Sequence, residues 1–321
     1  MKKILKFSGY ILGIFFFAYS FSQVQWSDFI SSIKNVATPW IAIMAASFLL
    51  SMFLRSVRWH IITGLPWINM SKVWEATAIG YLGTAIYPAK AGDILKSIRL
   101  QQLTGISNTE ALMSTLIDRL FDGLALCGIL AILVIAWGKQ LNLNFVVWII
   151  AACFILGLFV IALYSVSGHR LERFFTSLAT QSKVGTRLNQ IYQQSLTAVH
   201  LLKSPKLLCS CLTIQILITL FDILACWFLF YAFGWKELSL LPAIIMLAYL
   251  AAAFSLPSTP GYIGVYQIAS IFALRGFGIS ESEAVAYGTI FQTITFVLFV
   301  SVGIQTKLRR PKKYMQLADE T

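Results

Sequence analysis

Asp118 and Asp122 lie four residues apart in an otherwise apolar stretch, and two carboxylates at this spacing could do chemistry. On a helix, residues i and i+4 share one face, and Arg119 reaches Asp122 at i, i+3. The two acids could share a Mg²⁺ ion or pair with bases from other segments. A single Asp-x-x-x-Asp is a weak metal signal, and no second acidic cluster or histidine motif joins it. We therefore expect no metal site and predict an ion-paired network that locks the fold, serves function, or does both.

A second charged stretch begins with a proline and a glycine. Pro88 and Gly92 would open the backbone just before a helix, whose N-terminal N–H groups form a ready site for phosphate. We predict that Lys90 and Lys96 contact an anionic lipid headgroup there, while Asp93 orients a lysine or discriminates among headgroups. The alternative is an interfacial helix whose cations touch lipid headgroups at the membrane surface.

Two arginines and one isolated acid complete the candidate charged residues. Arg55 and Arg58 end an apolar stretch, and we expect them to bind substrate or to pair with the acids described above. Asp222 lies in the middle of another apolar stretch, so it should bind a proton or cation, or pair with a base from the other half of the chain. Trp59 and Trp67 flank the end that carries the arginines, where we expect them to anchor it at the membrane interface.

A third stretch, residues 256–267, holds hydroxyls, glycines and one amide but no charge. Backbone N–H groups that follow Pro260 and Gly261 could bind an anion or a polar headgroup. The alternative is a tight loop that lets helices pack closely. The residues that we expect to shape the backbone of the two broken stretches are Pro88, Gly92, Pro257, Pro260, Gly261, Gly264 and Gln267.

These residues are embedded in a strongly apolar chain. Of the 321 residues, 58% are hydrophobic and only 12% are charged, whereas soluble domains carry about 25% charged residues. Uncharged runs reach the roughly 20 helical residues that a bilayer core requires, and a lone strand cannot satisfy its backbone in lipid. We therefore predict an all-α polytopic membrane protein, with residues 1–321 forming one integral membrane domain. The uncharged runs are 7–27, 35–54, 140–168, 238–274 and 284–306.

The distribution of basic residues predicts the topology. If five basic groups face the cytoplasm, 20 of the 25 lysines and arginines lie inside, as the positive-inside rule requires. Both termini, a basic linker at 166–204 and a basic tail at 307–321 would then be cytoplasmic, in the cell (inner) membrane. This placement predicts six full spans and two re-entrant helical hairpins, with eight transmembrane helices as the alternative. The expected spans are about 7–25, 37–57, 109–137, 144–165, 206–232 and 281–306, and the expected hairpins are 72–108 and 238–278.

An internal repeat supports this path. Residues 105–111 match residues 278–284 at Gly, Ile, Ser, Glu and Ala. In both copies the Ser and the Glu have the spacing of a capping box at a helix start. The pseudo-repeats would be 1–137 and 144–306, inserted with opposite orientation. Inverted repeats with discontinuous helices are typical of membrane transporters, whose substrate site lies at the repeat interface.

Three motifs in this order resemble the lysylphosphatidylglycerol synthase transmembrane (flippase-like) family. They are Pro-Ala-Lys-Ala-Gly-Asp, Asp-Arg-Leu-Phe-Asp and Pro-Ser-Thr-Pro-Gly-Tyr-Ile-Gly. The resemblance implies a polytopic membrane protein that moves lipids or lipid-linked groups between leaflets. The family usually has arginine and glutamate where this chain has Lys90 and Asp93, which changes reach and bidentate geometry. We expect no soluble aminoacyl-transferase domain, and we carry over no synthase activity from the resemblance.

We therefore predict a lipid translocase whose partners are membrane lipids, with an anionic headgroup. No GxxxxGK[ST] motif for direct ATP use occurs, so we expect neither an enzyme nor a cofactor. Nucleic acid is not expected as a partner, and formation of a homo-oligomer stays open. The alternatives are a membrane-embedded transferase that acts on a lipid phosphate at Asp118 and Asp122, or a non-catalytic scaffold whose basic segments bind anionic lipid.

Overall fold

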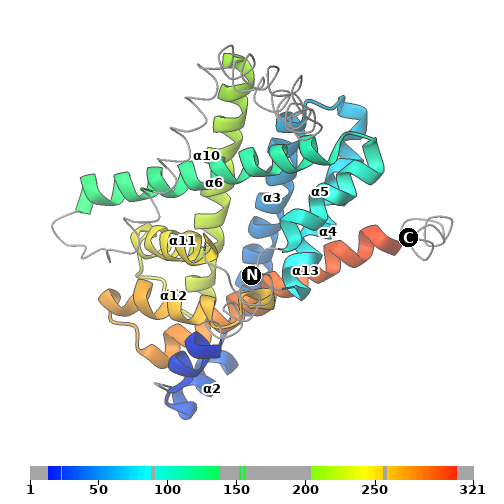
Figure 1. Cartoon of the computed structure of the whole chain (residues 1–321). Helices are drawn as coiled ribbons and strands as arrows, with labels where there is room; N and C mark the ends of the chain where they lie inside the picture. The colour runs from blue at the N-terminus through cyan, green and yellow to red at the C-terminus, as the bar shows by residue number, and fades with distance from the viewer. Residues whose placement is uncertain are drawn as a thin grey trace.

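The computed structural model describes residues 14–22, 24–87, 91–137, 204–255 and 259–308, together with the single positions 152 and 155. Every regular element in these ranges is a helix, as the sequence predicts (Figure 1). The longer helices are α2 (Trp26–Lys34), α3 (Thr38–Thr63), α4 (Met70–Ile86), α5 (Ala91–Thr104), α6 (Asn108–Trp137), α10 (Pro205–Ala232), α11 (Leu240–Ser255), α12 (Val265–Leu274) and α13 (Glu281–Leu308). Short 3₁₀ turns lie at η1 (Trp67–Asn69), η3 (Pro260–Tyr262) and η4 (Arg275–Phe277).

The two long helices α3 and α10 run antiparallel, side by side, through the middle of the molecule (Figure 1). Ala37 at the start of α3 donates its N–H to the carbonyl of Ala232 at the end of α10, at 2.8 Å. Further along, Ser47 Oγ donates to the carbonyl of Phe221 at 3.0 Å. A serine is small enough to let the two backbones approach, so the pair packs along much of its length.

Among the described helices, α3, α10 and α13 are long and apolar enough to cross a membrane, with mean hydropathies of 1.8, 2.2 and 1.8. At about 1.5 Å per residue, the 26 residues of α3 extend roughly 39 Å, more than the hydrocarbon core of about 30 Å. Helix α6 begins within one residue of the expected third span and crosses α3 and α10. The expected span 144–165, most of the linker 166–204 and most of the tail 307–321 lie outside the described residues.

The helix that contains the expected second span, about 37–57, is longer than that span. Helix α3 continues to Thr63 and ends at Gly64, whose φ of 67° is left-handed. The extra turns are buried rather than interfacial, and Trp59 is fully buried. Our expectation that Trp59 anchors the helix at the interface is therefore wrong, because its ring packs inside the protein. Trp67, by contrast, is exposed, as an anchor requires.

Helices α4 and α5 form a closely packed antiparallel hairpin over the predicted first re-entrant stretch. Glycines make the close approach possible. A Cβ atom added to Gly80 would lie 2.7 Å from Cβ of Lys96, and one added to Gly92 would lie 2.9 Å from the backbone nitrogen of Thr84. The helix that carries Lys96 is therefore held against α4 at a distance that only glycine allows.

Helices α11 and α12 form a second helical hairpin, over the other predicted stretch. The rings of Tyr249 on α11 and Phe272 on α12 stack with centroids 6.1 Å apart. The turn between the two helices contacts the end of the first hairpin, since a Cβ atom on Gly261 would lie 3.7 Å from the carbonyl oxygen of Ala85. The end of α4 therefore contacts the 3₁₀ turn η3 of the second hairpin inside the protein.

Both predicted capping boxes are present. Glu110 N–H donates to Ser107 Oγ at 3.1 Å, and Ser107 N–H donates to the Glu110 carboxylate at 3.0 Å. Ser280 and Glu283 make the same reciprocal pair at 3.3 and 3.0 Å. These pairs satisfy backbone donors at the first turns of α6 and α13. The two matching sequence segments thus begin equivalent long helices.

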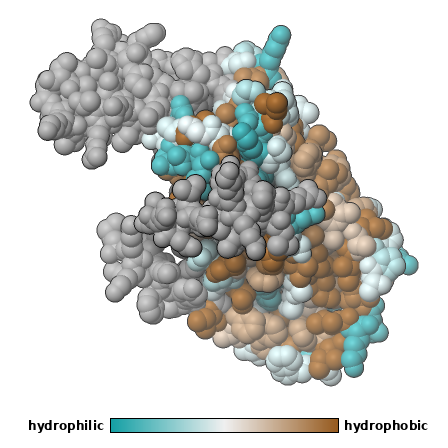
Figure 2. All heavy atoms as spheres, turned by 90° about the vertical axis from the view of Figure 1, so that its right-hand side faces the viewer, coloured by the Kyte–Doolittle hydropathy of each residue, from teal (hydrophilic) through white to brown (hydrophobic). Residues whose placement is uncertain are grey.

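The outer surface is apolar where a lipid environment would require it. On the side of the molecule where α4 and α5 lie, hydrophobic residues cover a broad area and hydrophilic residues gather beyond its edges (Figure 2). Large apolar side chains are exposed along α3, α6 and α10, for example Phe53, Leu116 and Ile216. An exposed apolar surface of this kind fits contact with lipid or with another protein.

Candidate functional site

Asp122 on α6 is the centre of an ion-pair network. Its Oδ1 accepts from Arg55 Nη1 and from Arg58 Nη2, each at 2.9 Å. Its Oδ2 accepts from Arg119 Nη1, also at 2.9 Å. The carboxylate therefore joins α6 to α3 through two arginines and is held by a third on its own helix.

Arg58 occupies the space between the two acids of α6. Its side chain is fully buried, and Nη2 lies 2.7 Å from Asp118 Oδ1 and 2.9 Å from Asp122 Oδ1. Nη1 donates to the side-chain carbonyl of Gln215 on α10. The cation between Asp118 and Asp122 is thus a guanidinium group, where a Mg²⁺ ion was one of the sequence alternatives.

Lys96 is also a member of this ion-pair network. Its Nζ lies 2.9 Å from Asp118 Oδ2 and 4.2 Å from the ring centroid of Trp59, a cation–π contact. The indole N–H of Trp59 donates to Ser114 Oγ at 3.1 Å and so fixes the ring. The side chain of Lys96 is only 6% exposed. In this conformation the lysine faces the protein interior, not an approaching headgroup.

Asp222 pairs with a base from the other half of the chain, one of the two expected alternatives. Its Oδ2 lies 2.5 Å from Arg55 Nη2, and its Oδ1 accepts from Ser51 Oγ at 2.5 Å. Both partners belong to α3, so Asp222 connects α10 to the same arginine that holds Asp122. Only 7% of the Asp222 side chain is exposed.

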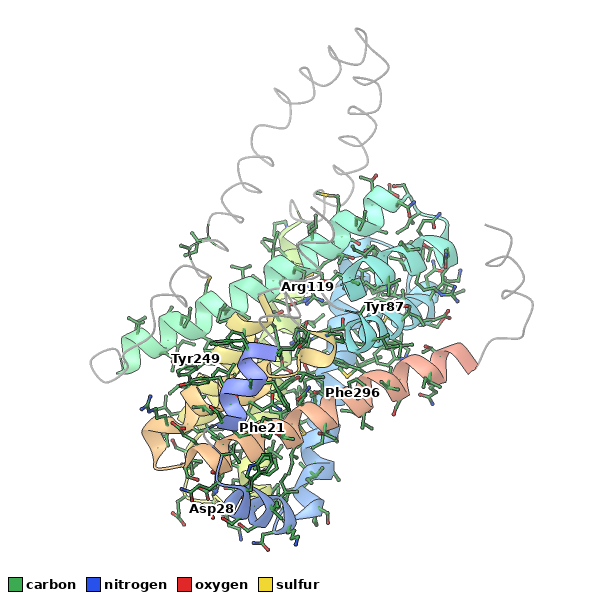
Figure 3. The ribbon with its side chains drawn as sticks, turned by 60° about the horizontal axis from the view of Figure 1, so that its bottom comes forward. Phe21, Asp28, Tyr87, Arg119, Tyr249 and Phe296 are labelled. Carbon is green, nitrogen blue, oxygen red and sulfur yellow. The ribbon has the colours of Figure 1, made fainter. Side chains whose placement is uncertain are left out.

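Arg119 and Asp93 form the accessible end of the network. Arg119 Nε lies 3.1 and 3.0 Å from the two carboxylate oxygens of Asp93, and Nη2 lies 2.5 Å from Oδ1. The Arg119 side chain is 45% exposed and that of Asp93 is 22% exposed. Figure 3 shows Arg119 beside α6, near the end of α4 where Tyr87 lies. Asp93 therefore pairs with an arginine of α6, whereas we had expected it to orient a lysine or to discriminate among headgroups. The second of these roles stays a prediction.

The network is electrically balanced in the part of the chain that the structure describes. Four bases and four acids are connected through consecutive ion pairs. Unpaired charges in a low-dielectric environment are costly, and mutual pairing offsets part of that cost. The members are Arg55, Arg58, Lys96, Arg119, Asp93, Asp118, Asp122 and Asp222. Arg99 stays outside the network and pairs with Glu75 at 2.7 Å.

The turn of the second hairpin is held by amide side chains. Gln267 Oε1 accepts from the N–H of Gly264 at 3.0 Å, and Gln267 Nε2 donates to Gln292 Oε1 at 2.9 Å. Gln292 Nε2 in turn donates to the carbonyl of Gly261 at 3.0 Å. The N–H of Gly264 is therefore satisfied within the protein, which favours the expected alternative of a tight loop over that of an anion site.

The backbone of this turn needs its glycines. Gly261 and Gly264 have φ values of 62° and 84°, and Tyr262 between them has a φ of 56°, which is rare for a residue with a side chain. Pro260 opens the 3₁₀ turn that contains Gly261. Pro257, like Pro88 and Lys90 at the first hairpin, lies outside the described residues.

Comparison with known protein families identifies the family of this chain. A model of the lysylphosphatidylglycerol synthase TM region matches residues 5–303, nearly the whole chain. The chain belongs to this family. All eight residues of the network fall within the matched range. Neither a curated protein nor a solved structure matches the chain. Family membership and the three long apolar helices together identify a membrane-embedded multi-pass protein.

Sequence reasoning missed three polar residues of the site. Gln215 binds Arg58, Ser51 binds Asp222, and Gln292 supports the second hairpin. A signal exists for the two glutamines, because each is an isolated amide in a long apolar stretch. A buried amide in such a stretch requires a hydrogen-bond partner, which points to a polar neighbour from another helix.

Proposed function

We propose that the protein is a lipid translocase, in which a polar headgroup crosses the membrane along the ion-pair network while the acyl chains stay in lipid. The observation that carries this proposal is the network itself. Eight charged side chains lie among apolar helices, and one end is partly open to the outside of the protein. Intramembrane charges are costly and commonly mark a substrate pathway.

We propose that the architecture consists of six full spans and two re-entrant hairpins arranged as an inverted repeat. Corresponding helices make corresponding contacts. The α4–α5 hairpin contacts α13 of the other half, and the α11–α12 hairpin contacts α6. The two hairpins are in contact at Gly261 and Ala85, and a substrate site between two halves would lie at such a contact. Both termini would face the cytoplasm, in the cell membrane.

The network explains how a headgroup could move without exposing bare charge to lipid. A phosphate that reaches Arg119 can replace the Asp93 carboxylate as a bidentate acceptor, since the fork of a guanidinium fits either group. Arg55 then offers the next guanidinium, because it shares Asp122 with Arg119. At each step the phosphate gains a guanidinium partner, so the phosphate itself does not cross the membrane as an unpaired charge.

Reconstitution into lipid vesicles tests the proposal. Lipids with an acyl-chain fluorophore are placed in both leaflets, and a membrane-impermeant reductant bleaches the outer leaflet. A translocase brings inner-leaflet lipid outward, so the bleached fraction exceeds half in proteoliposomes but not in empty vesicles. Equal bleaching of the two samples for every lipid tried would contradict the proposal.

Variants connect that activity to the network. Arg119→Gln should lower translocation strongly while folding is retained, because Arg119 is the most exposed member. Arg275→Gln is the matched control, since Arg275 is an exposed arginine in a 3₁₀ turn outside the network. Loss of activity in both variants to the same degree would remove Arg119 from the substrate path. Monodisperse elution in detergent confirms that each variant is folded.

A further inference from the structure

We infer that the headgroup carried by this protein is zwitterionic, with a phosphate and a primary ammonium group. The inference rests on the proposed translocase function and specifies its substrate class. It changes the expectation of an anionic headgroup that the basic residues alone suggested. The observation behind it is the distribution of exposed charge in the network.

The network has a closed end and an open end. Arg58, Lys96, Asp118 and Asp222 have side chains no more than 7% exposed, and they pair with one another or with the members nearest to them. The open end consists of Arg119, Arg55, Asp93 and Asp122, which are 45, 26, 22 and 21% exposed. Among the residues that the structure describes, an incoming headgroup therefore meets two cations and two carboxylates of the network at this end.

No base of the network is free to neutralise an additional anion. Arg55 has both terminal nitrogens on carboxylates, and Arg119 contacts Asp93 and Asp122. A phosphate can bind only if it takes a guanidinium from its carboxylate. When it takes Arg119 from Asp93, that carboxylate loses its partner within the protein, where an uncompensated charge is costly.

A headgroup with its own ammonium removes this penalty. The phosphate pairs with Arg119 while the ammonium donates to the Asp93 carboxylate, so both original charges keep a partner. The exposed pair is bidentate and compact, with oxygens 2.5 to 3.1 Å from the guanidinium nitrogens. Phosphate and ammonium are separated by only two carbons in an ethanolamine headgroup, so one headgroup can reach both partners. A glycerol headgroup has no cation, and a choline headgroup has a cation that cannot donate a hydrogen bond.

The test compares three lipids in the vesicle assay, each labelled on an acyl chain. The probes are phosphatidylethanolamine, phosphatidylcholine and phosphatidylglycerol. We expect phosphatidylethanolamine to move on the order of tenfold faster than phosphatidylglycerol, with phosphatidylcholine slower than phosphatidylethanolamine. Equal or faster movement of phosphatidylglycerol would overturn the inference and leave the translocase proposal standing. Movement of none of the three lipids would instead count against the proposed function itself.

A variant separates headgroup chemistry from general loss of activity. Asp93→Asn removes the carboxylate that the ammonium would bind, and it leaves Arg119 with surplus positive charge. We expect the preference to reverse, with phosphatidylglycerol faster than phosphatidylethanolamine. Glu75→Gln is the matched control, because Glu75 is an acid of the same hairpin that pairs with Arg99 outside the network. An unchanged preference in Asp93→Asn would overturn the inference, as would the same reversal in Glu75→Gln.

Discussion

Arg55 and Asp222 join the two antiparallel helices α3 and α10, with Arg55 Nη2 lying 2.5 Å from Asp222 Oδ2. Each residue comes from a different half of the chain and stands seventeen residues after the first residue of its helix. The two residues of the pair therefore occupy equivalent positions along two long apolar helices. The ion-pair network therefore connects the two halves of the chain and does not lie within one of them.

Exchanging the two charges tests this connection. Arg55→Asp and Asp222→Arg should each destabilise the protein, because each places two like charges together in a buried position. The double variant restores an opposite pair and should recover part of the lost thermal stability in detergent. If the double variant is no more stable than the two single variants, Arg55 and Asp222 do not interact directly.

Removing Arg58 should be the most damaging truncation in the network. Arg58→Ala leaves Asp118, Asp122 and Gln215 without their shared donor in a fully buried position. Loss of one partner of a buried ion pair costs about 3–5 kcal/mol. Thermal unfolding followed by circular dichroism measures this effect, with Arg275→Ala as an exposed control. A melting temperature as high as that of the control would show that Arg58 is dispensable.

Gly80 is predicted to position Lys96. A methyl group at Gly80 would meet Cβ of Lys96 at 2.7 Å, so Gly80→Ala should push α5 away from α4 and weaken the Lys96–Asp118 pair. Overpacking of this kind costs about 1–3 kcal/mol. Gly276→Ala is a suitable control, because no atom lies within 4 Å of its added Cβ. Equal stability of the two variants would indicate that the hairpin tolerates a wider separation.

Lys90 remains a prediction from the sequence, since it lies outside the described residues. Lys90→Ala should reduce lipid translocation while insertion and folding are retained, because the hairpin is held by the glycine contacts of Gly80 and Gly92. Translocation by purified, monodisperse protein is the measurement. If folded yield falls and the activity per folded molecule is unchanged, Lys90 has a structural role only.

The positions of helices were predictable from the sequence, whereas the choice of ion-pair partners was not. Apolar length and the two capping boxes placed α6, α10 and α13 within a few residues, since these signals are local. Helical spacing showed that Asp93 and Lys96 share a broad face. Helical spacing could not show that Asp93 pairs with Arg119 and Lys96 with Asp118. The choice of partner depends on how closely α5 packs on its neighbours.

The same limit explains the incorrect assignment of Trp59. A tryptophan at the end of an apolar run is typical of a membrane interface, but its burial depends on what packs against it. Here Ser114 accepts its N–H and Lys96 lies over its ring, so the residue supports the network. Contacts between segments more than 30 residues apart decide the role of this side chain, and no local pattern encodes them.

The sharing of Asp122 among Arg55, Arg58 and Arg119 has a genetic consequence. A single codon change that replaces Asp122 with a neutral residue would leave one surplus positive charge, shared by three arginines. The network, which is neutral with Asp122, would then bind anions. Restoring neutrality would then require the loss of any one of the three. Chains descended from a common ancestor should therefore change these four positions together, with an arginine disappearing wherever the aspartate does.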